Sequence, residues 1–133
     1  MLFRSILFAF IMGCSFFNKI SNQNPFKSTV WISRITSNCI DTLKFMNDGR
    51  VYSYSCEIDY TSKGLYRVDG RKVVLNIIED SHGKSEMWRY KFFLDNEFLV
   101  PISSEQKWKG KWELRKTTFD NSYVFVRLKY FYN

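Results

Sequence analysis

The stretch that decides the fold is residues 39–58, CIDTLKFMNDGRVYSYSCEI. Asn47-Asp48-Gly49 divides it into two runs in which apolar and polar side chains alternate. Such alternation is typical of β-strands with one buried face, and Asp-Gly between two alternating runs is a strong signal for a hairpin. We therefore expect strands over 39–46 and 50–58. If Asp48-Gly49 is a two-residue loop, Phe45 faces Tyr52 and Leu43 faces Tyr54.

The same alternating pattern continues along the chain on both sides of this hairpin. Further strands are expected over 29–35, 64–68, 71–79, 85–94, 97–102, 108–116 and 122–129. In residues 108–116, Trp108, Gly110, Trp112 and Leu114 share one side of the pattern, and in the last run Val124, Val126 and Leu128 share a face. The chain is thus predicted to be all-β, an antiparallel up-and-down meander of about eight or nine strands. A closed barrel is preferred because closure removes open edges and Gly110 suits a strand bend; a two-sheet β-sandwich is the alternative.

Composition limits the remaining possibilities. The 133 residues suit one small domain, and 13 Phe, 8 Tyr and 4 Trp supply large side chains for its core. Lys and Arg number 20 against 13 Asp and Glu, which gives a net charge of +7. Because there is one His and no glycine-rich phosphate loop, we expect neither a cofactor nor a metal.

The first fourteen residues have the pattern of an export signal. Arg4 precedes the apolar run ILFAFIM at 6–12, and Gly13-Cys14 follows. An ordinary cleaved secretory signal and a buried N-terminal strand are the alternatives. Ile11-Met12-Gly13-Cys14 resembles the lipobox of bacterial lipoproteins, in which a small residue precedes the Cys that becomes the mature N-terminus.

The lipobox resemblance implies a cellular location and a domain organisation. Residues 1–13 would be a lipoprotein signal peptide, 14–28 an acylated Cys14 with a flexible tether, and 29–133 the barrel domain. Fatty acids such as palmitate on Cys14 would make the membrane a partner. Because Ser15-Phe16-Phe17-Asn18 holds no acidic residue, the resemblance implies a bacterial cell-envelope protein on the outer membrane, facing the periplasm.

Cysteine counting then predicts a disulfide. With Cys14 acylated, Cys39 and Cys56 remain as a pair in an oxidising compartment, one on each arm of the hairpin. The two-residue loop places Asp41 opposite Cys56 and Cys39 diagonal to it, so that a bulge or one changed loop residue brings the sulfurs within bonding range. The bridge would stabilise the fold by about 3 kcal/mol in the chain-entropy model. Two buried thiols are the alternative in a reducing compartment.

The barrel region resembles the lipocalin-like domains of small bacterial lipoproteins. The resemblance rests on Trp31, Phe45-x-x-Asp48-Gly49, Gly64-x-Tyr66-x-Val68-x-Gly70 and the later aromatic strands, without the Gly-x-Trp start of true lipocalins. It implies a binding or accessory protein for a small hydrophobic ligand or an envelope component. The candidate ligand-lining residues are Tyr52, Tyr54, Trp88, Tyr90, Phe92, Trp108 and Trp112. The alternative, which the size of an eight-stranded barrel favours, is that these aromatic side chains fill the interior as a packed core.

Other functions find less support in the sequence. In residues 108–116 the basic side chains Lys109, Lys111 and Arg115 fall on the solvent side of the alternation, opposite the aromatic ones. A solvated face explains this pattern, and an envelope location argues against nucleic acid as a partner. Asp80-Ser81-His82 holds the residue types of a catalytic triad, but neighbours in one turn do not converge, so no catalytic residue is assigned and no enzyme is expected. The alternative function is an inhibitor or immunity lipoprotein that binds a partner hydrolase or toxin. Oligomeric state is not predicted.

Overall fold

A computed structural model describes residues 23–81 and 83–129 of the chain. Its strands are β1 (Thr29–Thr36), β2 (Cys39–Phe45), β3 (Arg50–Ser55), β4 (Tyr60–Asp69), β5 (Lys72–Ser81), β6 (Lys84–Asp95), β7 (Phe98–Trp108), β8 (Lys111–Lys116) and β9 (Phe125–Arg127). One short 3-10 helix, η1 (Asn121–Tyr123), precedes β9. The lipobox with Cys14, the signal peptide and His82 lie outside the described residues.

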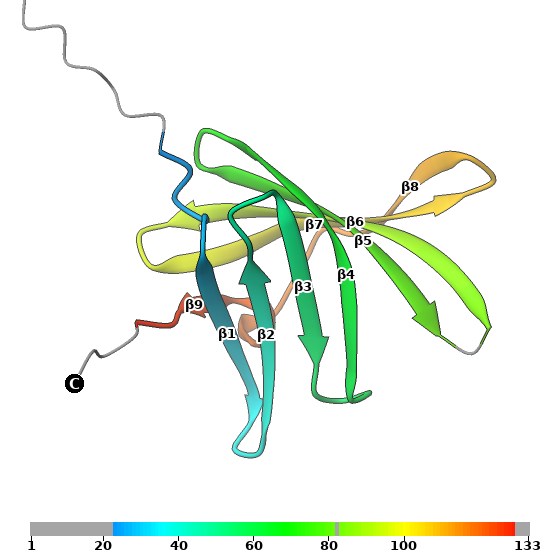
Figure 1. Ribbon diagram of the computed structural model, residues 1–133. Helices are drawn as coiled ribbons and strands as arrows, with labels where there is room; N and C mark the ends of the chain where they lie inside the picture. The colour runs from blue at the N-terminus through cyan, green and yellow to red at the C-terminus, as the bar shows by residue number, and fades with distance from the viewer. Residues whose placement is uncertain (1–22, 82, 130–133) are drawn as a thin grey trace, which may run out of the picture.

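The strands close into a barrel (Figure 1). Each of β1 to β6 pairs antiparallel with its successor, β7 pairs with β6, and β9 lies between β7 and β1. These eight strands form an up-and-down barrel with lipocalin-like geometry, and β8 is an extra strand that pairs with the end of β7. The predicted all-β barrel is therefore confirmed.

The β2–β3 turn holds one residue more than predicted. Phe45 pairs with Val51, and the Met46 N–H donates to the Arg50 carbonyl at 2.8 Å, so Asn47-Asp48-Gly49 is a three-residue loop. Gly49 has a φ of 87°, a left-handed conformation that completes loops of this length. The predicted two-residue register is thus wrong by one residue, and such a slip exchanges the two faces of a strand.

The segment 108–116, predicted as one strand, instead holds the end of β7, the turn at Lys109-Gly110 and strand β8. Lys109 and Gly110 have φ values of 47° and 78°, as both central residues of a type I′ turn require. Trp108 therefore pairs with Lys111, and Trp112 pairs with Lys107 on the opposite face. The expected shared face of Trp108 and Trp112 is wrong because this turn lies between them.

Two further corrections concern the strands that complete the barrel. Strand β7 continues to Trp108, beyond the predicted end at residue 102. A register shift, which marks a bulge, falls next to Pro101. A residue without an N–H is tolerated at a bulge, so Pro101 does not end the strand. In β9 the inward residue is Phe125, which packs edge-on against Phe92 at 5.9 Å between ring centroids, and Val126 is 41% exposed. The face on which Val124, Val126 and Leu128 were expected together is therefore not the inward one at Val126.

One end of the barrel is closed by a side chain from before β1. Phe26 is fully buried, with its ring 5.2 Å from that of Phe45 and 5.8 Å from that of Trp31 between centroids. Asn24 Oδ1 accepts from the Phe26 N–H at 2.9 Å and fixes the bend that inserts the ring. Burial of such a side chain stabilises a fold by about 1.5–3 kcal/mol. Residues 24–28, which we assigned to the tether, thus belong to the barrel domain.

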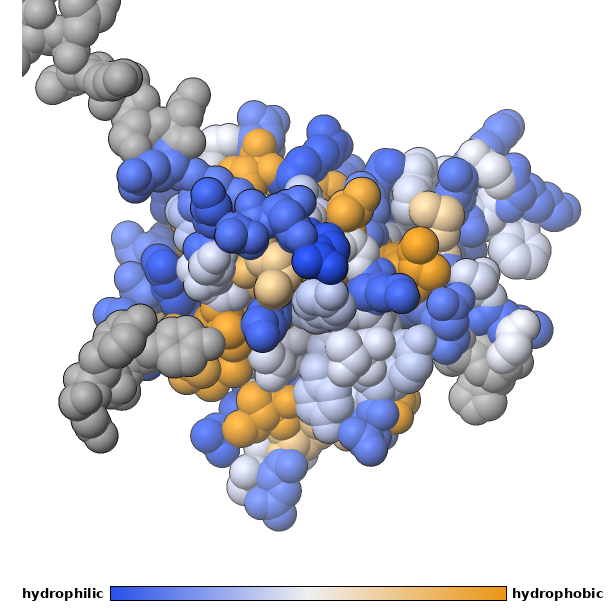
Figure 2. Space-filling model, viewed as in Figure 1, coloured by the Kyte–Doolittle hydropathy of each residue, from blue (hydrophilic) through white to orange (hydrophobic). Residues whose placement is uncertain are grey.

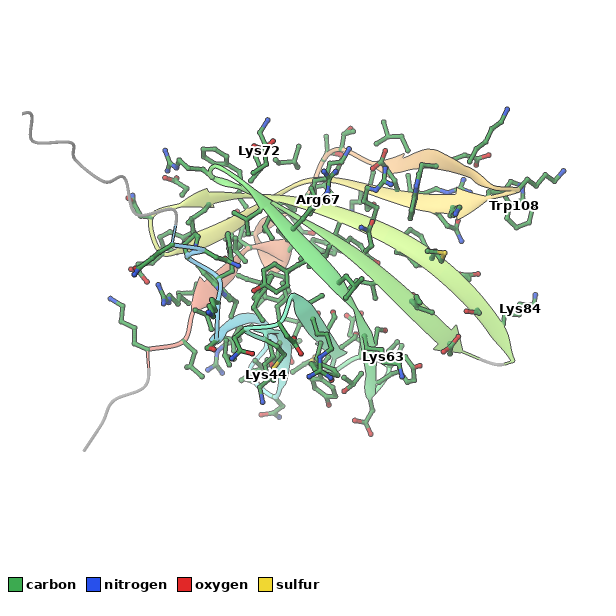
Figure 3. The ribbon with its side chains drawn as sticks, turned by 45° about the horizontal axis from the view of Figure 1, so that its top comes forward. Lys44, Lys63, Arg67, Lys72, Lys84 and Trp108 are labelled. Carbon is green, nitrogen blue, oxygen red and sulfur yellow. A yellow bond between two sulfur atoms is a disulfide. The ribbon has the colours of Figure 1, made fainter. Side chains whose placement is uncertain are left out.

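The outer surface carries both polar and apolar side chains, and Ile58 and Leu65 are among the exposed apolar ones. Apolar areas are scattered between hydrophilic ones on the face shown in Figure 2. Basic side chains are spread around the outside, from Lys44 on β2 to Lys84 on β6 (Figure 3). Among the described residues, no helix is long and apolar enough to cross a membrane.

Candidate ligand-binding site

The end of the barrel opposite Phe26 holds a cavity of about 350 Å³. We call this cavity the mouth pocket; it is at the lower end of the size range of ligand sites. Its lining residues are Asp41, Leu43, Ser53, Ser55, Ile58, Leu75, Glu79, Trp88, Tyr90, Phe92, Pro101, Ser103, Ser104, Lys116, Phe119, Tyr123 and Phe125.

Small inward side chains leave the space for this pocket. On β3, buried Val51 near the closed end is followed on the same face by Ser53 and Ser55, which line the pocket. On β7, the bulge brings both Ser103 and Ser104 to the pocket. A small hydroxyl side chain fills less of the barrel interior than an aliphatic one, so the packed core gives way to a cavity with hydroxyl groups on its wall.

Glu79 and Tyr90 form the polar centre of the mouth pocket. The Tyr90 hydroxyl donates to Glu79 Oε1 at 3.3 Å across the β5–β6 pair. Burial raises the pKa of the Glu79 carboxyl, and the facing carboxylate of Glu86 raises it further. Burial and the Glu79 charge likewise raise the pKa of the Tyr90 hydroxyl, which stays protonated as a donor. The two groups therefore present a carboxyl oxygen and a phenol to a bound molecule.

A disulfide braces the rim. Cys39 and Cys56 are bonded, with 5.4 Å between their Cα atoms, which confirms the predicted bridge. It joins the first residue of β2 to the β3–β4 turn, and Asp41 Oδ1 accepts from the Cys56 N–H at 2.9 Å. Within the described residues, the ligating atoms of Cys39, Asp41 and Cys56 lie within 4.8 Å of one another, but the disulfide occupies both sulfurs, so we assign no metal there.

The segment after β8 supplies an aromatic part of the rim. The Lys116 ammonium lies 4.3 Å from the centroid of the Tyr123 ring and 5.3 Å from that of Phe119. Asp120 caps η1 by accepting from the Ser122 N–H at 2.9 Å, and Ser33 Oγ on β1 donates to the Ser122 carbonyl at 2.6 Å. These contacts hold Tyr123 at the pocket.

The structure brings together only part of the predicted ligand-lining set. Trp88, Tyr90 and Phe92 line the mouth pocket, and the Trp88 and Tyr90 rings stack with 6.0 Å between centroids. Tyr52 and Tyr54 lie on the other face of β3 from Val51 because of the three-residue loop, and the Tyr54 hydroxyl donates to exposed Asp59 at 3.0 Å.

The two hairpin tryptophans also lie outside this lining. Trp108 is 54% exposed, and Trp112 packs beneath the Arg89 guanidinium, which is 4.0 Å from its ring centroid. Sequence reasoning missed the serines, Glu79, Phe119 and Tyr123. An inward serine leaves no trace in a hydrophobic pattern. Phe119 falls between two predicted strands, and Tyr123 alternates out of phase with Val124, Val126 and Leu128 in the predicted strand over 122–129.

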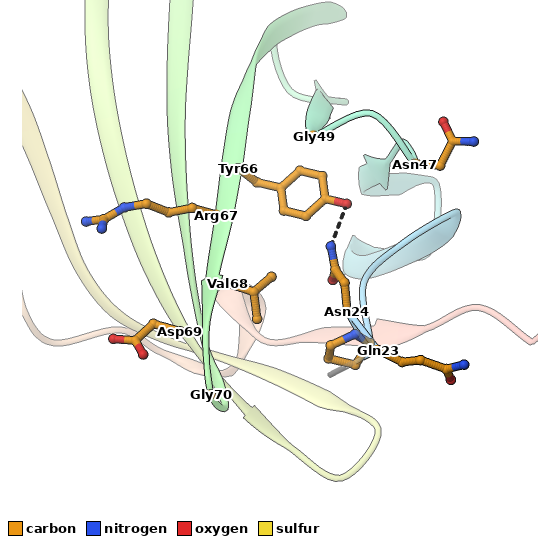
Figure 4. A pocket seen from close by; sticks show the side chains of 10 residues that line it. Gln23, Asn24, Asn47, Gly49, Tyr66, Arg67, Val68, Asp69 and Gly70 are labelled. Carbon is orange, nitrogen blue, oxygen red and sulfur yellow. Dashed lines mark hydrogen bonds between the residues drawn. The ribbon is translucent and has the colours of Figure 1, made fainter. Parts of the chain in front are cut away.

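A second hollow, of about 520 Å³, lies at the closed end (Figure 4). It is lined by Gln23, Asn24, Pro25, Asn47, Gly49, Tyr66, Arg67, Val68, Asp69 and Gly70. Its central polar groups bond to one another, since Asn24 Nδ2 donates to the Tyr66 hydroxyl at 3.1 Å and that hydroxyl donates to the Met46 carbonyl at 2.7 Å. The mouth pocket, with aromatic walls and Glu79, is therefore the better candidate site.

Comparison with known proteins adds no assignment: no family model, curated protein or solved structure matches the chain.

Replacing Glu79 tests the electrostatics of the mouth pocket. A raised pKa means that the folded protein binds this proton more tightly than the unfolded chain does. The stabilisation that this proton gives the folded protein is fully present below the ordinary pKa of 4.5, and it is lost as the pH rises through the raised pKa of Glu79. Glu79→Gln imitates the protonated form, so at pH 7 it should raise the free energy of unfolding by about 1 kcal/mol or less.

Urea unfolding at pH 4 and pH 7 measures this difference. The advantage of Glu79→Gln should grow between the two pH values, whereas exposed Glu57→Gln, with the same change of charge, should show no such growth. A variant that loses stability relative to the parent as the pH rises would contradict the desolvation of Glu79.

Proposed function

We propose that this protein is a lipid-anchored cell-envelope protein whose barrel binds a small apolar ligand or envelope component in the mouth pocket. The observation that carries the proposal is a cavity of about 350 Å³ inside a barrel whose other end is closed by Phe26. Apolar walls with a few convergent polar groups are the usual chemistry of small-molecule sites. Here Trp88, Phe92 and Phe125 provide wall area, and Tyr90 and Glu79 provide polar groups.

The anchoring part of the proposal rests on Gly13-Cys14 in the sequence and on the disulfide. A Cys39–Cys56 bridge supports an oxidising compartment, because disulfides persist outside the cytosol. The described chain also enters the barrel at the closed end, beside Phe26. An anchor at Cys14 would then attach the membrane nearer to this end and leave the mouth pocket accessible to solvent.

Binding of a neutral probe tests the ligand proposal. We expect 2-naphthylmethanol to shift the amide resonances of pocket strands β3, β6 and β7 in a ¹H–¹⁵N NMR titration. Ser55→Trp should fill part of the pocket and weaken binding about tenfold or more, whereas Ser85→Trp, exposed on β6, should leave it unchanged. Both variants must show the dispersed spectrum of the parent. Absence of binding, or equal weakening by both variants, would contradict the ligand proposal.

Metabolic labelling tests the anchor. In a bacterial host fed an alkynyl fatty acid, the full chain should carry the label and fractionate with membranes. Cys14→Ser should lose the label and enter the aqueous fraction, because the thiol is the acylated atom and two or more acyl chains are needed for stable anchoring. Ser15→Ala should behave as the parent does. A label that survives Cys14→Ser would refute acylation at this residue.

A second candidate function, inhibition of a partner hydrolase or immunity to a toxin, is favoured by the β7–β8 hairpin. This hairpin projects beyond the barrel (Figure 1), and within the described residues β8 pairs with β7 alone. Residues 107–116 carry five Lys or Arg side chains and one Glu, and Trp108 and Leu114 are 54% and 61% exposed. An open, basic edge with exposed apolar side chains suits contact with an acidic protein surface.

A further inference from the structure

The charge of the mouth pocket is opposite to that of the protein. The chain has a net charge of +7, yet the ionisable side chains that line the pocket include the acids Asp41 and Glu79 and one base, Lys116. A third acid, Glu86, pairs directly with Glu79 across β5 and β6. Like charges directly opposite each other in a sheet are unfavourable, so this pair costs free energy unless a cation lies near it.

Two basic side chains of β6 are paired outside the pocket. Arg89 and Lys91 on β6 contact the Glu105 carboxylate at 3.7 and 3.1 Å. Lys116 lies over Tyr123 at the rim. Among the ion pairs of the described residues, none involves Glu79 or Asp41. The cation that would compensate Glu79 is therefore not supplied by these side chains.

The aromatic walls suit such a cation. The faces of aromatic rings attract an ammonium group within about 6 Å of their centroids. The rim already uses this interaction, since the Lys116 ammonium lies 4.3 Å from the Tyr123 ring centroid. Deeper in the pocket, the stacked rings of Trp88 and Tyr90 lie on the same strand face, and Tyr90 contacts Glu79.

We propose that the mouth pocket selects ligands that carry a protonated amine next to an apolar group, with Glu79 as the residue that binds the ammonium. The inference rests on the proposed function, because it names the ligand class of the same pocket. A primary ammonium would donate to the Glu79 carboxylate and rest against the ring of Trp88 or Tyr90. The apolar part would lie against the walls formed by Phe92 and Phe125.

Three matched probes test this selectivity on the folded full-length barrel by NMR titration at pH 7. They are 2-naphthylmethylamine, which is protonated, 2-naphthylmethanol, which is neutral, and 2-naphthylacetate, which is anionic. We expect the amine to bind about tenfold more tightly than the alcohol, because charge-assisted hydrogen bonds are stronger than neutral ones, and the acetate to bind least. Glu79→Gln should weaken binding of the amine much more than binding of the alcohol, so that the amine loses its advantage.

Asp69→Asn is the control for net charge. Asp69 is exposed on β4 at the closed end, so this variant changes the total charge by the same amount without touching the mouth pocket, and it should keep the amine preference. If the alcohol binds and the amine binds no better, the ligand proposal stands and this inference is wrong. Tightest binding of the acetate would also overturn it, and failure of all three probes to bind would overturn both proposals.

Discussion

The three-residue turn between β2 and β3 determines what the barrel contains. Because Asn47-Asp48-Gly49 forms the loop, Phe45 pairs with Val51, and the inward face of β3 consists of Val51, Ser53 and Ser55. With one loop residue fewer, Tyr52 and Tyr54 would point inward, and two phenol rings would occupy the space that the serines leave. The cavity at the mouth, on which the proposed ligand binding rests, thus depends on the left-handed conformation of Gly49.

The two ends of the barrel have different structural roles. At the closed end, aromatic rings around Phe26 supply the packing that a small domain needs, and the Thr29 hydroxyl links Phe26 to Trp31 by donating to the Phe26 carbonyl at 2.5 Å and accepting from Trp31 Nε1 at 2.9 Å. At the mouth, packing is looser, and the Cys39–Cys56 bridge instead holds the start of β2 to the β3–β4 turn. A covalent brace at the end that lacks a core is a reasonable way to keep a cavity open, because the small inward side chains there contribute little burial energy.

The sequence predicted most of the fold but only three of the residues that line the candidate site. Alternation with Asp-Gly turns located the strands and predicted closure, and the placement of Cys39 and Cys56 on one hairpin predicted their bridge. Loop length did not follow from the residues, since Asn47-Asp48-Gly49 suits a loop of two or three residues. Trp88, Tyr90 and Phe92 were predicted because β6 alternates cleanly. The serines were not predicted, because a small polar residue that faces inward has the same pattern as one that faces solvent. Burial of Phe26 was not predicted either, because its neighbours in the sequence are polar and indicate a tether.

The register of β2 against β3 in solution is the most direct test of this account. With methyl-labelled Val51 and assigned aromatic protons, nuclear Overhauser effects report which side chain lies against Phe45. We expect strong contacts from the Val51 methyl groups to the rings of Phe45 and Tyr66, all three of which belong to the buried core. Contacts from the Tyr52 ring to Phe45, with Val51 exposed to solvent, would show the other register and contradict the cavity on which both proposals depend.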